Sequence, residues 1–324
     1  MPSRVVSARP VGDQACCAVV VYVPGVNCGA SCIKNHRHTA DYNVGRFLKQ
    51  LQTQLFDVHK RQYPIVAFHT DLKTTQRRIL RGKTRSPVMF HKINLNPMAL
   101  PMNLRPMFAA IVNATKGAHE NGNLFLPEKA GATFRGFQQR MLSRFYAGEM
   151  MVHKALKGYK YVLRFDATDT RITSAFSYDP FARAQMLKSV FTYRSTTLEA
   201  TTVGVNALLH GWMDDYSFSG KLLKPFVYKT KKNEFFHDGR AYDSSMQMFK
   251  MQAFQGSSLY KSMFEQVDKT GLFLLGDTNE HALTEGQFLS LVIPFLASSS
   301  PETVTEFTDV PIQYPVDLDE PYTQ

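Results

Sequence analysis

The spacing of apolar residues near the start of the chain predicts a strand, a helix and two further strands. The run CAVVVYVPG (Cys17–Gly25) is apolar until it stops at Pro-Gly, which is typical of a buried strand. Apolar side chains then recur at helical spacing over Val44–Phe56, and Asp41 is placed to cap this helix. The apolar runs Pro64–Leu72 and Arg85–Leu95 predict the next two strands. This order indicates a βαβ unit and a parallel sheet.

The pattern resumes after an interruption and predicts one α/β domain over residues 15–324, preceded by a basic leader at residues 1–14. Residues 95–128 are rich in proline and glycine, which indicates an irregular insertion, and residues 300–324 form an acidic tail. The remaining predicted elements are a helix at Phe134–Leu156, strands at Tyr159–Phe165 and Ser189–Thr196, helices at Ala200–His210 and Ser244–Phe264, a strand at Gly271–Leu275 and a helix at Thr284–Leu296.

Charge and cysteine usage restrict the class of partner and the compartment. The chain of 324 residues has a net charge of +11, which favours nucleotide phosphates, nucleic acid or an anionic membrane surface as partner. No aromatic stacking platform interleaves with the basic residues, so specific nucleic-acid binding is not expected. The most apolar run, Ala15–Val26, is too short to cross a membrane. All 4 cysteines lie at or before Cys32, which favours a soluble protein in a reducing compartment, such as a microbial or viral-host cytoplasm.

Two aspartates directly follow the predicted mid-chain strand. In the stretch GYKYVLRFDATDTRI (Gly158–Ile172), apolar alternation ends at Asp166 and Asp169. Ligands of open α/β sheets bind at the carboxyl ends of strands, and Mg²⁺ or Mn²⁺ takes carboxylate oxygens there. The alternative is an acidic turn whose aspartates face water. The spacing alone leaves both interpretations open.

Three further clusters have a chemical and a structural interpretation. Arg140 and Arg144 lie one helical turn apart and can clamp phosphate oxygens, or they form a solvated basic face. The loop Leu275–His281 offers acid–base groups, or it is a capping turn before the last helix. The stretch Cys28–His38 has a partial zinc-ligand spacing, but its crowded histidines favour a reduced basic loop. No P-loop, dinucleotide-binding, nucleophile-elbow or HExxH motif occurs.

Three collinear blocks share their motifs with one enzyme family. Gln139–Phe181 contains Q-R-M-L-S-R-F-Y-A-G, H-K-A-L-K-G-Y-K-Y-V-L-R-F-D and Y-D-P-F, Phe254–His281 ends in G-D-T-N-E-H, and Phe307–Pro315 reads F-T-D-V-P-I-Q-Y-P. These blocks resemble the fungal α-1,2-mannosyltransferases of glycosyltransferase family 15, of which the chain looks like a divergent member. The resemblance implies a GT-A-like, Rossmann-like fold: a mostly parallel central sheet flanked by helices in a single domain.

The resemblance also implies an activity and roles for particular residues. It implies a metal-dependent retaining glycosyltransferase that moves a hexose, with mannose from GDP-mannose as the expected donor, onto a glycan or glycoprotein acceptor. Asp166 falls on the family's glutamate that is expected to ligate Mn²⁺ or Mg²⁺. Asp277 falls on an aspartate expected near the acceptor or the reacting carbon, and His281, preceded by Glu280, falls on the histidine of the same motif. Arg140, with Arg144, is expected to add positive charge to the phosphate pocket.

The chain departs from the family pattern at three places. Gln139 replaces a tyrosine near the donor, and Gln247 stands where the family has a glutamate proposed as nucleophile or acceptor-site acid. Gln313 and Tyr314 replace a histidine pair that supplies a further metal ligand, a loss for which Asp169 can compensate. A glutamine amide can neither form a glycosyl ester nor act as a general base, so attack on the face of the departing phosphate remains the route to retention. The alternative is a degenerate transferase that binds nucleotide or glycan without turnover.

Two residues at the end of the first strand complete the predicted site. Tyr22 and Pro24, near the end of the first predicted strand, are expected to contact the sugar nucleotide. Members of the family are usually anchored in the Golgi membrane. A lumenal domain of a Golgi enzyme without its anchor is therefore the alternative to a cytoplasmic protein.

Overall fold

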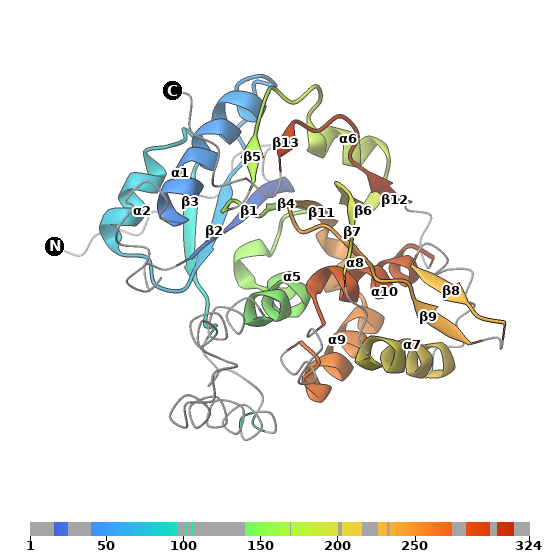
Figure 1. Cartoon of the computed structure of the whole chain (residues 1–324). Helices are drawn as coiled ribbons and strands as arrows, with labels where there is room; N and C mark the ends of the chain where they lie inside the picture. The colour runs from blue at the N-terminus through green and yellow to red at the C-terminus, as the bar shows by residue number, and fades with distance from the viewer. Residues whose placement is uncertain are drawn as a thin grey trace, which may run out of the picture.

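A seven-stranded sheet forms the centre of the computed structural model (Figure 1), with strand order β12-β6-β11-β4-β1-β2-β3. Its strands are β1 Cys17–Val23, β2 Ile65–His69, β3 Val88–Lys92, β4 Tyr161–Phe165, β6 Ser189–Tyr193, β11 Met246–Lys250 and β12 Thr303–Glu306. The structure describes residues 16–24, 40–95, 102, 105, 140–168, 170–199, 203–215, 226–231, 234–273, 283–298 and 303–313.

The first half of the chain forms the predicted parallel unit. β1 pairs in parallel with β2, and β2 pairs in parallel with β3. The connecting helices are α1 (Ala40–Leu51) and α2 (Thr74–Arg81). α1 continues into a π-helical turn at Gln52–Phe56, so the predicted helix is confirmed through Phe56. Asp41 lies inside α1 and does not precede it, so its predicted capping position is wrong.

The chain then crosses to the other side of β1. β4 pairs in parallel with β1, which therefore lies between β2 and β4. β11 is antiparallel to both β4 and β6, and β12 is parallel to β6. The sheet is thus mixed but mostly parallel. The strand order reverses between β1 and β4, and such a switch point is where open α/β sheets bind ligands.

Two predicted elements in the second half are wrong in part: Ser244–Lys250 is not helical, and Gly271–Phe273, the described part of a predicted strand, is not a strand. The predicted helix Ser244–Phe264 contains the strand β11, followed by α8 (Met251–Gln255) and α9 (Ser258–Thr270). Methionine, glutamine and lysine favour helices, but β11 is a central strand buried on both faces, and tertiary packing overrides that propensity. The predicted strand at Gly271–Leu275 begins with a turn, because Gly271 adopts a left-handed φ of 73° and ends α9.

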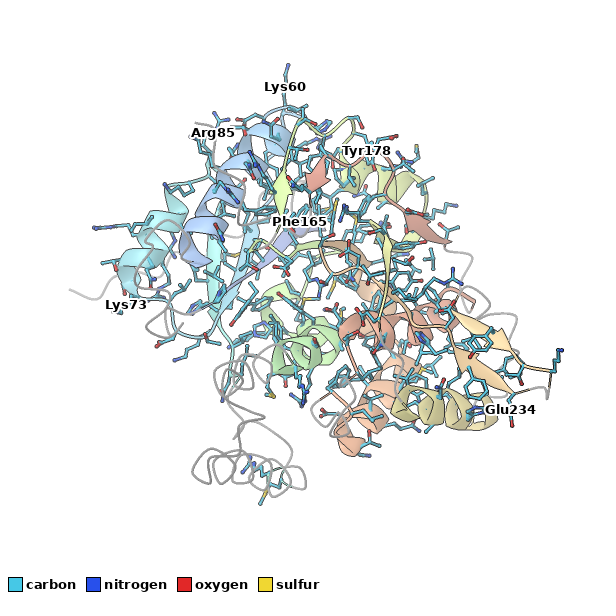
Figure 2. All side chains as sticks on the ribbon, viewed as in Figure 1. Lys60, Lys73, Arg85, Phe165, Tyr178 and Glu234 are labelled. Carbon is cyan, nitrogen blue, oxygen red and sulfur yellow. The ribbon has the colours of Figure 1, made fainter. Side chains whose placement is uncertain are left out.

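Each face of the sheet packs against its own set of helices. Strand residues alternate between the faces, so Leu163 and Phe165 of β4 pack with α1 and α6 (Pro180–Met186) on one side. Val162 packs on the other side with α5 (Met150–Val152), α9 and α10 (Glu285–Ser298). Phe165 lies at the centre of the molecule, whereas labelled charged residues such as Lys73 project from its outside (Figure 2).

Further helices and short strands pack beside this sheet. α7 (Val203–Asp215) packs against β9, and α10 packs against β10. None of the helices in the described ranges has the length and apolar character needed to cross a membrane. The remaining strands form three two-stranded sheets: β5 Arg171–Ile172 with β13 Ile312–Gln313, β7 Thr196–Leu198 with β10 Arg240–Tyr242, and β8 Val227–Lys229 with β9 Phe235–His237.

The helix predicted at Phe134–Leu156 is confirmed over residues 140–152, with one π-helical turn inside it. Residues 140–144 are helical, Phe145–Glu149 form a π-helical turn, and α5 ends at Val152. Gly148 permits this turn to contact α9, because a Cβ at this position would lie 2.0 Å from the Phe264 ring. π-Helical turns often occur near functional sites. The predicted leader, the insertion beyond residue 95 apart from residues 102 and 105, and the tail beyond residue 313 lie outside the described residues, whereas β12 and β13 occupy the tail's first part.

Candidate functional site

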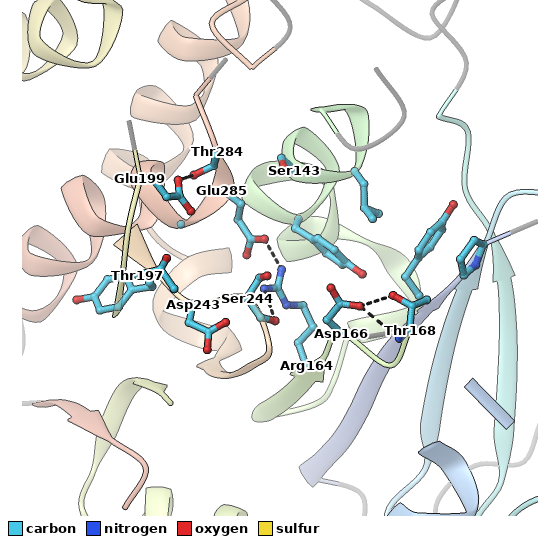
Figure 3. Close-up of a pocket in the computed structure, with 16 residues that line it drawn as sticks. Ser143, Arg164, Asp166, Thr168, Thr197, Glu199, Asp243, Ser244, Thr284 and Glu285 are labelled. Atoms are coloured by element: carbon cyan, nitrogen blue, oxygen red, sulfur yellow. Dashed lines mark hydrogen bonds and ion pairs between the residues drawn. The ribbon is translucent and has the colours of Figure 1, made fainter. Parts of the chain in front are cut away.

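A cavity of about 530 Å³ opens at the carboxyl ends of β1 and β4, at the switch point of the sheet. This volume lies within the range of small-molecule sites. Six separate segments supply its walls, and the close-up shows their side chains converging on one space (Figure 3). The lining residues are Tyr22, Pro24, Leu142, Ser143, Tyr146, Arg164, Asp166, Thr168, Thr197, Glu199, Tyr242, Asp243, Ser244, Thr284, Glu285 and Gly286.

Asp166 is held at the end of β4 by the turn that follows it. Its Oδ1 atom accepts hydrogen bonds from the Thr168 hydroxyl at 2.7 Å and from the Thr168 backbone N–H at 3.3 Å. Its other carboxylate oxygen makes no hydrogen bond to a described residue, and no described basic side chain forms an ion pair with it. The turn therefore fixes the orientation of a carboxylate that still presents an oxygen to the cavity.

Arg164 lies two residues before Asp166 on the same face of β4, so both side chains reach the cavity. Its guanidinium forms an ion pair with Glu285 at the start of α10, and its Nη2 donates to the Ser244 carbonyl at 3.3 Å. The Tyr146 ring lies 4.2 Å from the guanidinium carbon. Burial alone would lower the pKa of Arg164, but the Glu285 carboxylate raises it, so the guanidinium stays charged.

Two further carboxylates lie on the other side of the cavity. Asp243 accepts a hydrogen bond from Arg194 at 3.0 Å and bonds from the hydroxyls of Ser195 and Ser245 at 2.9 and 2.7 Å. Glu199 accepts a hydrogen bond from the Thr284 hydroxyl at 2.5 Å. The described lining therefore contains four carboxylates and one guanidinium, and its other polar groups are mostly hydroxyls. Such a lining suits a cation and neutral hydroxyl-bearing ligands.

The donor atoms around Asp166 fit a hard divalent cation, since carboxylate and hydroxyl oxygens are the ligands that Mn²⁺ and Mg²⁺ prefer. Across the described residues, no three His, Cys, Asp or Glu side chains gather closely enough to hold a metal ion alone. This arrangement still matches the usual mode of Mg²⁺ binding, in which one or two carboxylates and the phosphates of a substrate share the coordination. The predicted zinc-like stretch Cys28–His38 lies outside the described residues.

Three predicted site residues lie together in the cavity: Tyr22 and Pro24 at the end of β1, and Asp166 at the end of β4. Residues at the ends of adjacent parallel strands meet at one edge of the sheet, which is why local sequence pattern could place them. Five other predicted site residues lie outside the described residues: Gln139, Asp169, Asp277, Glu280 and His281.

Arg144, predicted as part of a phosphate clamp, is paired with two carboxylates and lies outside the described cavity. Its Nε and Nη2 atoms donate to the two carboxylate oxygens of Asp268 in α9, at 2.5 and 2.8 Å, and its Nη1 atom pairs with Glu149. The side chain is buried and does not line the cavity. Arg140 does not line it either, and burial lowers the pKa of its guanidinium. A role of either arginine at a phosphate group stays a prediction.

Gln247 lies in the sheet and not on the cavity wall. It is the cross-strand neighbour of Arg164, it is fully buried, and its amide Nε2 donates to the Asp243 carbonyl at 2.9 Å. Its Oε1 is buried without a partner among the described residues. The acid that reaches the cavity from this part of the chain is Asp243, directly after β10, whereas Gln247 does not line the described cavity.

Gln313 lies near the same end of β4 without lining the described cavity. β13 pairs Gln313 with Arg171 of β5, the strand that follows the Asp166 turn. Arg194 connects this segment to the cavity, because it donates to Asp243 at 3.0 Å and to the Ile312 carbonyl at 3.3 Å. A metal-binding role for Gln313 stays a prediction.

Sequence reasoning missed Glu199, Asp243 and Glu285. Glu285 stands in the first turn of a helix, where an acid is explained by the helix dipole without any catalytic role. Glu199 and Asp243 lie at the ends of short strands and belong to no motif that we recognised. No local pattern distinguishes these acids from solvated ones, since they meet only after the chain has folded.

Comparisons with known proteins identify the fold. No protein-family model and no curated protein sequence matches the chain. Core-mannan synthase A (CmsA/Ktr4) from Aspergillus fumigatus, in its Mn/GDP form, superposes with a TM-score of 0.67 and 15% identity, covering 97% of this chain and 77% of that chain. The mannosyltransferase Ktr4p from S. cerevisiae gives a TM-score of 0.60 at 12% identity (95% and 72% covered), and its complex with GDP gives 0.62 at 11% (93% and 72%). The fold is that of a GT-A glycosyltransferase, as the sequence predicted.

Proposed function

We propose that this protein is a metal-dependent, retaining glycosyltransferase that moves a hexose from a sugar nucleotide, with GDP-mannose as the expected donor, to a glycan or glycoprotein acceptor. The main observation in support is the position of Asp166. Its carboxylate is oriented by Thr168, lacks an ion-pair partner among the described residues, and lies at the switch point of a GT-A sheet. The solved structures with the similar fold include one described with Mn and GDP.

The residues on the two sides of the cavity have different proposed roles. Asp166 and Thr168 would hold Mn²⁺ or Mg²⁺, which would neutralise the charge that develops on the departing diphosphate. Tyr22 and Pro24, next to them, would contact the nucleotide. Glu199 and Asp243 on the opposite side can accept hydrogen bonds from sugar hydroxyls. Asp277, Glu280 and His281 remain proposed contacts of the acceptor or the reacting carbon, Asp169 a proposed second metal ligand and Gln139 a proposed donor contact.

Retention does not require a carboxylate at position 247. Gln247 is fully buried, donates to the Asp243 carbonyl and does not line the described cavity, which supports a route without a nucleophile at this position. We propose instead that the acceptor attacks on the face from which the diphosphate departs, and that the leaving phosphate takes the acceptor's proton. The buried amide then supports the loop that carries Asp243.

A donor screen tests the proposal. Purified protein is incubated with GDP-mannose and other sugar nucleotides, with and without Mn²⁺, while GDP binding is followed by calorimetry. We expect Mn²⁺-dependent binding that weakens about tenfold or more in Asp166→Asn. Asp238→Asn is the matched control, because Asp238 pairs with Arg240 and does not line the cavity. Binding that ignores the metal, or equal binding by both variants, contradicts the proposal.

A binding protein without turnover is the second candidate. The family that the chain resembles has a glutamate where this chain has the buried amide of Gln247, and this difference favours the second candidate. Both candidates predict Mn²⁺-dependent GDP binding, so only turnover separates them. Release of sugar or transfer from any donor excludes the second candidate, whereas binding without either reaction across the donor panel excludes the first.

A further inference from the structure

Arg164 and Asp166 are unexpected neighbours in a site for a cation. Both project from the same face of β4, and Figure 3 shows Asp166 between Arg164 and Thr168. Opposite charges so close usually pair. Arg164 instead pairs with Glu285, which lies 121 residues further along the chain, at the start of α10.

The partner of Arg164 decides whether Asp166 can bind a cation. A guanidinium and a divalent cation repel each other, and the repulsion is strong where water is excluded. Arg164 is 1% exposed, so solvent screens its charge little. If its guanidinium turned towards Asp166, it would both occupy the carboxylate and oppose the metal. Glu285 removes both effects, because it neutralises the charge and directs the guanidinium to the α10 side.

We propose that Glu285 is a positioning residue whose carboxylate holds the Arg164 guanidinium away from Asp166 and so keeps Asp166 available to a divalent cation. This inference rests on the proposed function, since it assigns the metal to Asp166. Glu285 itself is not a metal ligand in this scheme. Its role is to act through Arg164.

Packing around the pair supports a fixed geometry. Tyr146 lies against the guanidinium, and the Ser244 carbonyl accepts from its Nη2 at 3.3 Å. The start of α10 is seated directly on β10, because a Cβ at Gly286 would lie 2.4 Å from the Tyr242 carbonyl oxygen. Glu285 therefore has little freedom to move away from Arg164. A buried ion pair often adds little net stability to a protein. This pair is therefore better explained by the position that it gives the guanidinium.

The test measures Mn²⁺ binding in the presence of GDP, by calorimetry, in folded protein checked by circular dichroism. We expect Glu285→Gln to weaken Mn²⁺ binding about tenfold or more, as loss of a residue that supports a metal ligand commonly does. Removing the guanidinium as well, in the double variant Glu285→Gln with Arg164→Met, should return the affinity to within about threefold of the wild type. A purely structural role for Glu285 predicts no such rescue.

Each outcome has a definite meaning. If the wild type binds no Mn²⁺ in the presence of GDP, or if Asp166→Asn binds it equally well, the proposed function fails. If binding depends on Asp166 but Glu285→Gln binds like the wild type, or the double variant is not rescued, only the positioning role is overturned. If Glu285→Gln does not fold, Glu285→Asp and the double variant replace it in the test. Both are expected to bind Mn²⁺ with an affinity within about threefold of the wild type. A folded variant of either kind that does not bind Mn²⁺ overturns the inference.

Discussion

Arg144 shows that the spacing of a charged residue does not define its role. It lies one helical turn from Arg140, as a phosphate clamp requires, yet Asp268 accepts hydrogen bonds from two of its nitrogens. Removing one partner of a buried ion pair leaves an uncompensated charge, which costs far more than the pair contributes. Glu149 also pairs with Arg144, but its side chain is 45% exposed.

The two partners of Arg144 therefore predict different losses of stability. Asp268→Asn should lower the free energy of unfolding by about 3 kcal/mol. Glu149→Gln, on the same arginine, should lower it by less than about 1 kcal/mol, since water screens an exposed pair. Urea unfolding of both variants checks this. Equal losses would show that Arg144 is not held mainly by Asp268.

His237 links stability to pH through a single buried ring. Its Nδ1 accepts from the Gly239 N–H at 3.1 Å, and its Nε2 lies 2.9 Å from the Ser290 hydroxyl. These bonds require the neutral ring, with Nε2–H as the donor to Ser290. Burial lowers the pKa of His237 from 6.5 to about 4. The folded protein therefore resists protonation over a range in which the unfolded chain takes up a proton.

His237 is expected to weaken the fold as the pH falls. Its full contribution is present above the unfolded pKa of 6.5 and is lost progressively down to about 4. Between about pH 7 and about pH 5, this residue alone should remove about 2 kcal/mol from the free energy of unfolding. Urea titrations at both pH values, in the wild type and in His237→Gln, isolate the contribution of His237 to the free energy of unfolding. A variant with the same pH dependence as the wild type would rule out His237 as its source.

The π-helical turn Phe145–Glu149 connects the helical segment at residues 140–152 to α9 and places Tyr146 in the cavity. Gly148 is the closest point of that contact, against the Phe264 ring. The Tyr260 hydroxyl donates to the Ala147 carbonyl in the same turn. Backbone and ring contacts of this kind leave no room for a side chain, so the turn depends on one glycine.

Two glycine substitutions should have opposite effects. Gly148→Ala should destabilise the protein by about 1–3 kcal/mol, because the added methyl overlaps a packed ring. Gly211→Ala should stabilise it by about 0.5–1 kcal/mol, since Gly211 lies in the exposed face of α7 with open space around its Cβ position. Thermal and urea unfolding test the pair. A neutral Gly148→Ala would mean that α9 can move away from the turn.

The cavity exists only in the folded chain, because residues far apart in the sequence form its walls. β1 and β4 bring Tyr22 and Asp166 to one edge, while α10 and the β7–β10 pair bring Glu285 and Glu199 from later in the chain. A ligand that contacts both groups must stabilise the whole fold, since it binds the folded state alone.

Ligand-induced stabilisation should therefore report on the complete site. With Mn²⁺ and GDP at about a hundred times their dissociation constant, the free energy of unfolding should rise by about 2.7 kcal/mol. Asp166→Asn should abolish the part that requires Mn²⁺. Urea unfolding with Mn²⁺, with GDP and with both ligands separates the contributions. Stabilisation that is identical in the variant would place the cation elsewhere.

Local pattern was sufficient for β1, β2, β3, α1 and the position of Asp166, whereas no pattern predicted α2. The apolar runs of β1, β2 and β3 and the helical spacing of α1 each report which side chains face the core, and the alternation in β4 places Asp166 at its end. These features depend on residues only a few positions apart. Such information is present in any short stretch of the chain.

The identity of β11 and the partners of the buried charges depend on residues far apart in the chain, so only the tertiary structure decided them. β11 is a strand because β4 and β6 lie on both sides of it, whatever its helix propensity. Arg144 is bound by a residue 124 positions away, and Arg164 by one 121 positions away. Whether a charge is buried and paired, or open to a ligand, depends on the neighbours that packing brings to it. The spacing of residues along the chain does not show which neighbours these are.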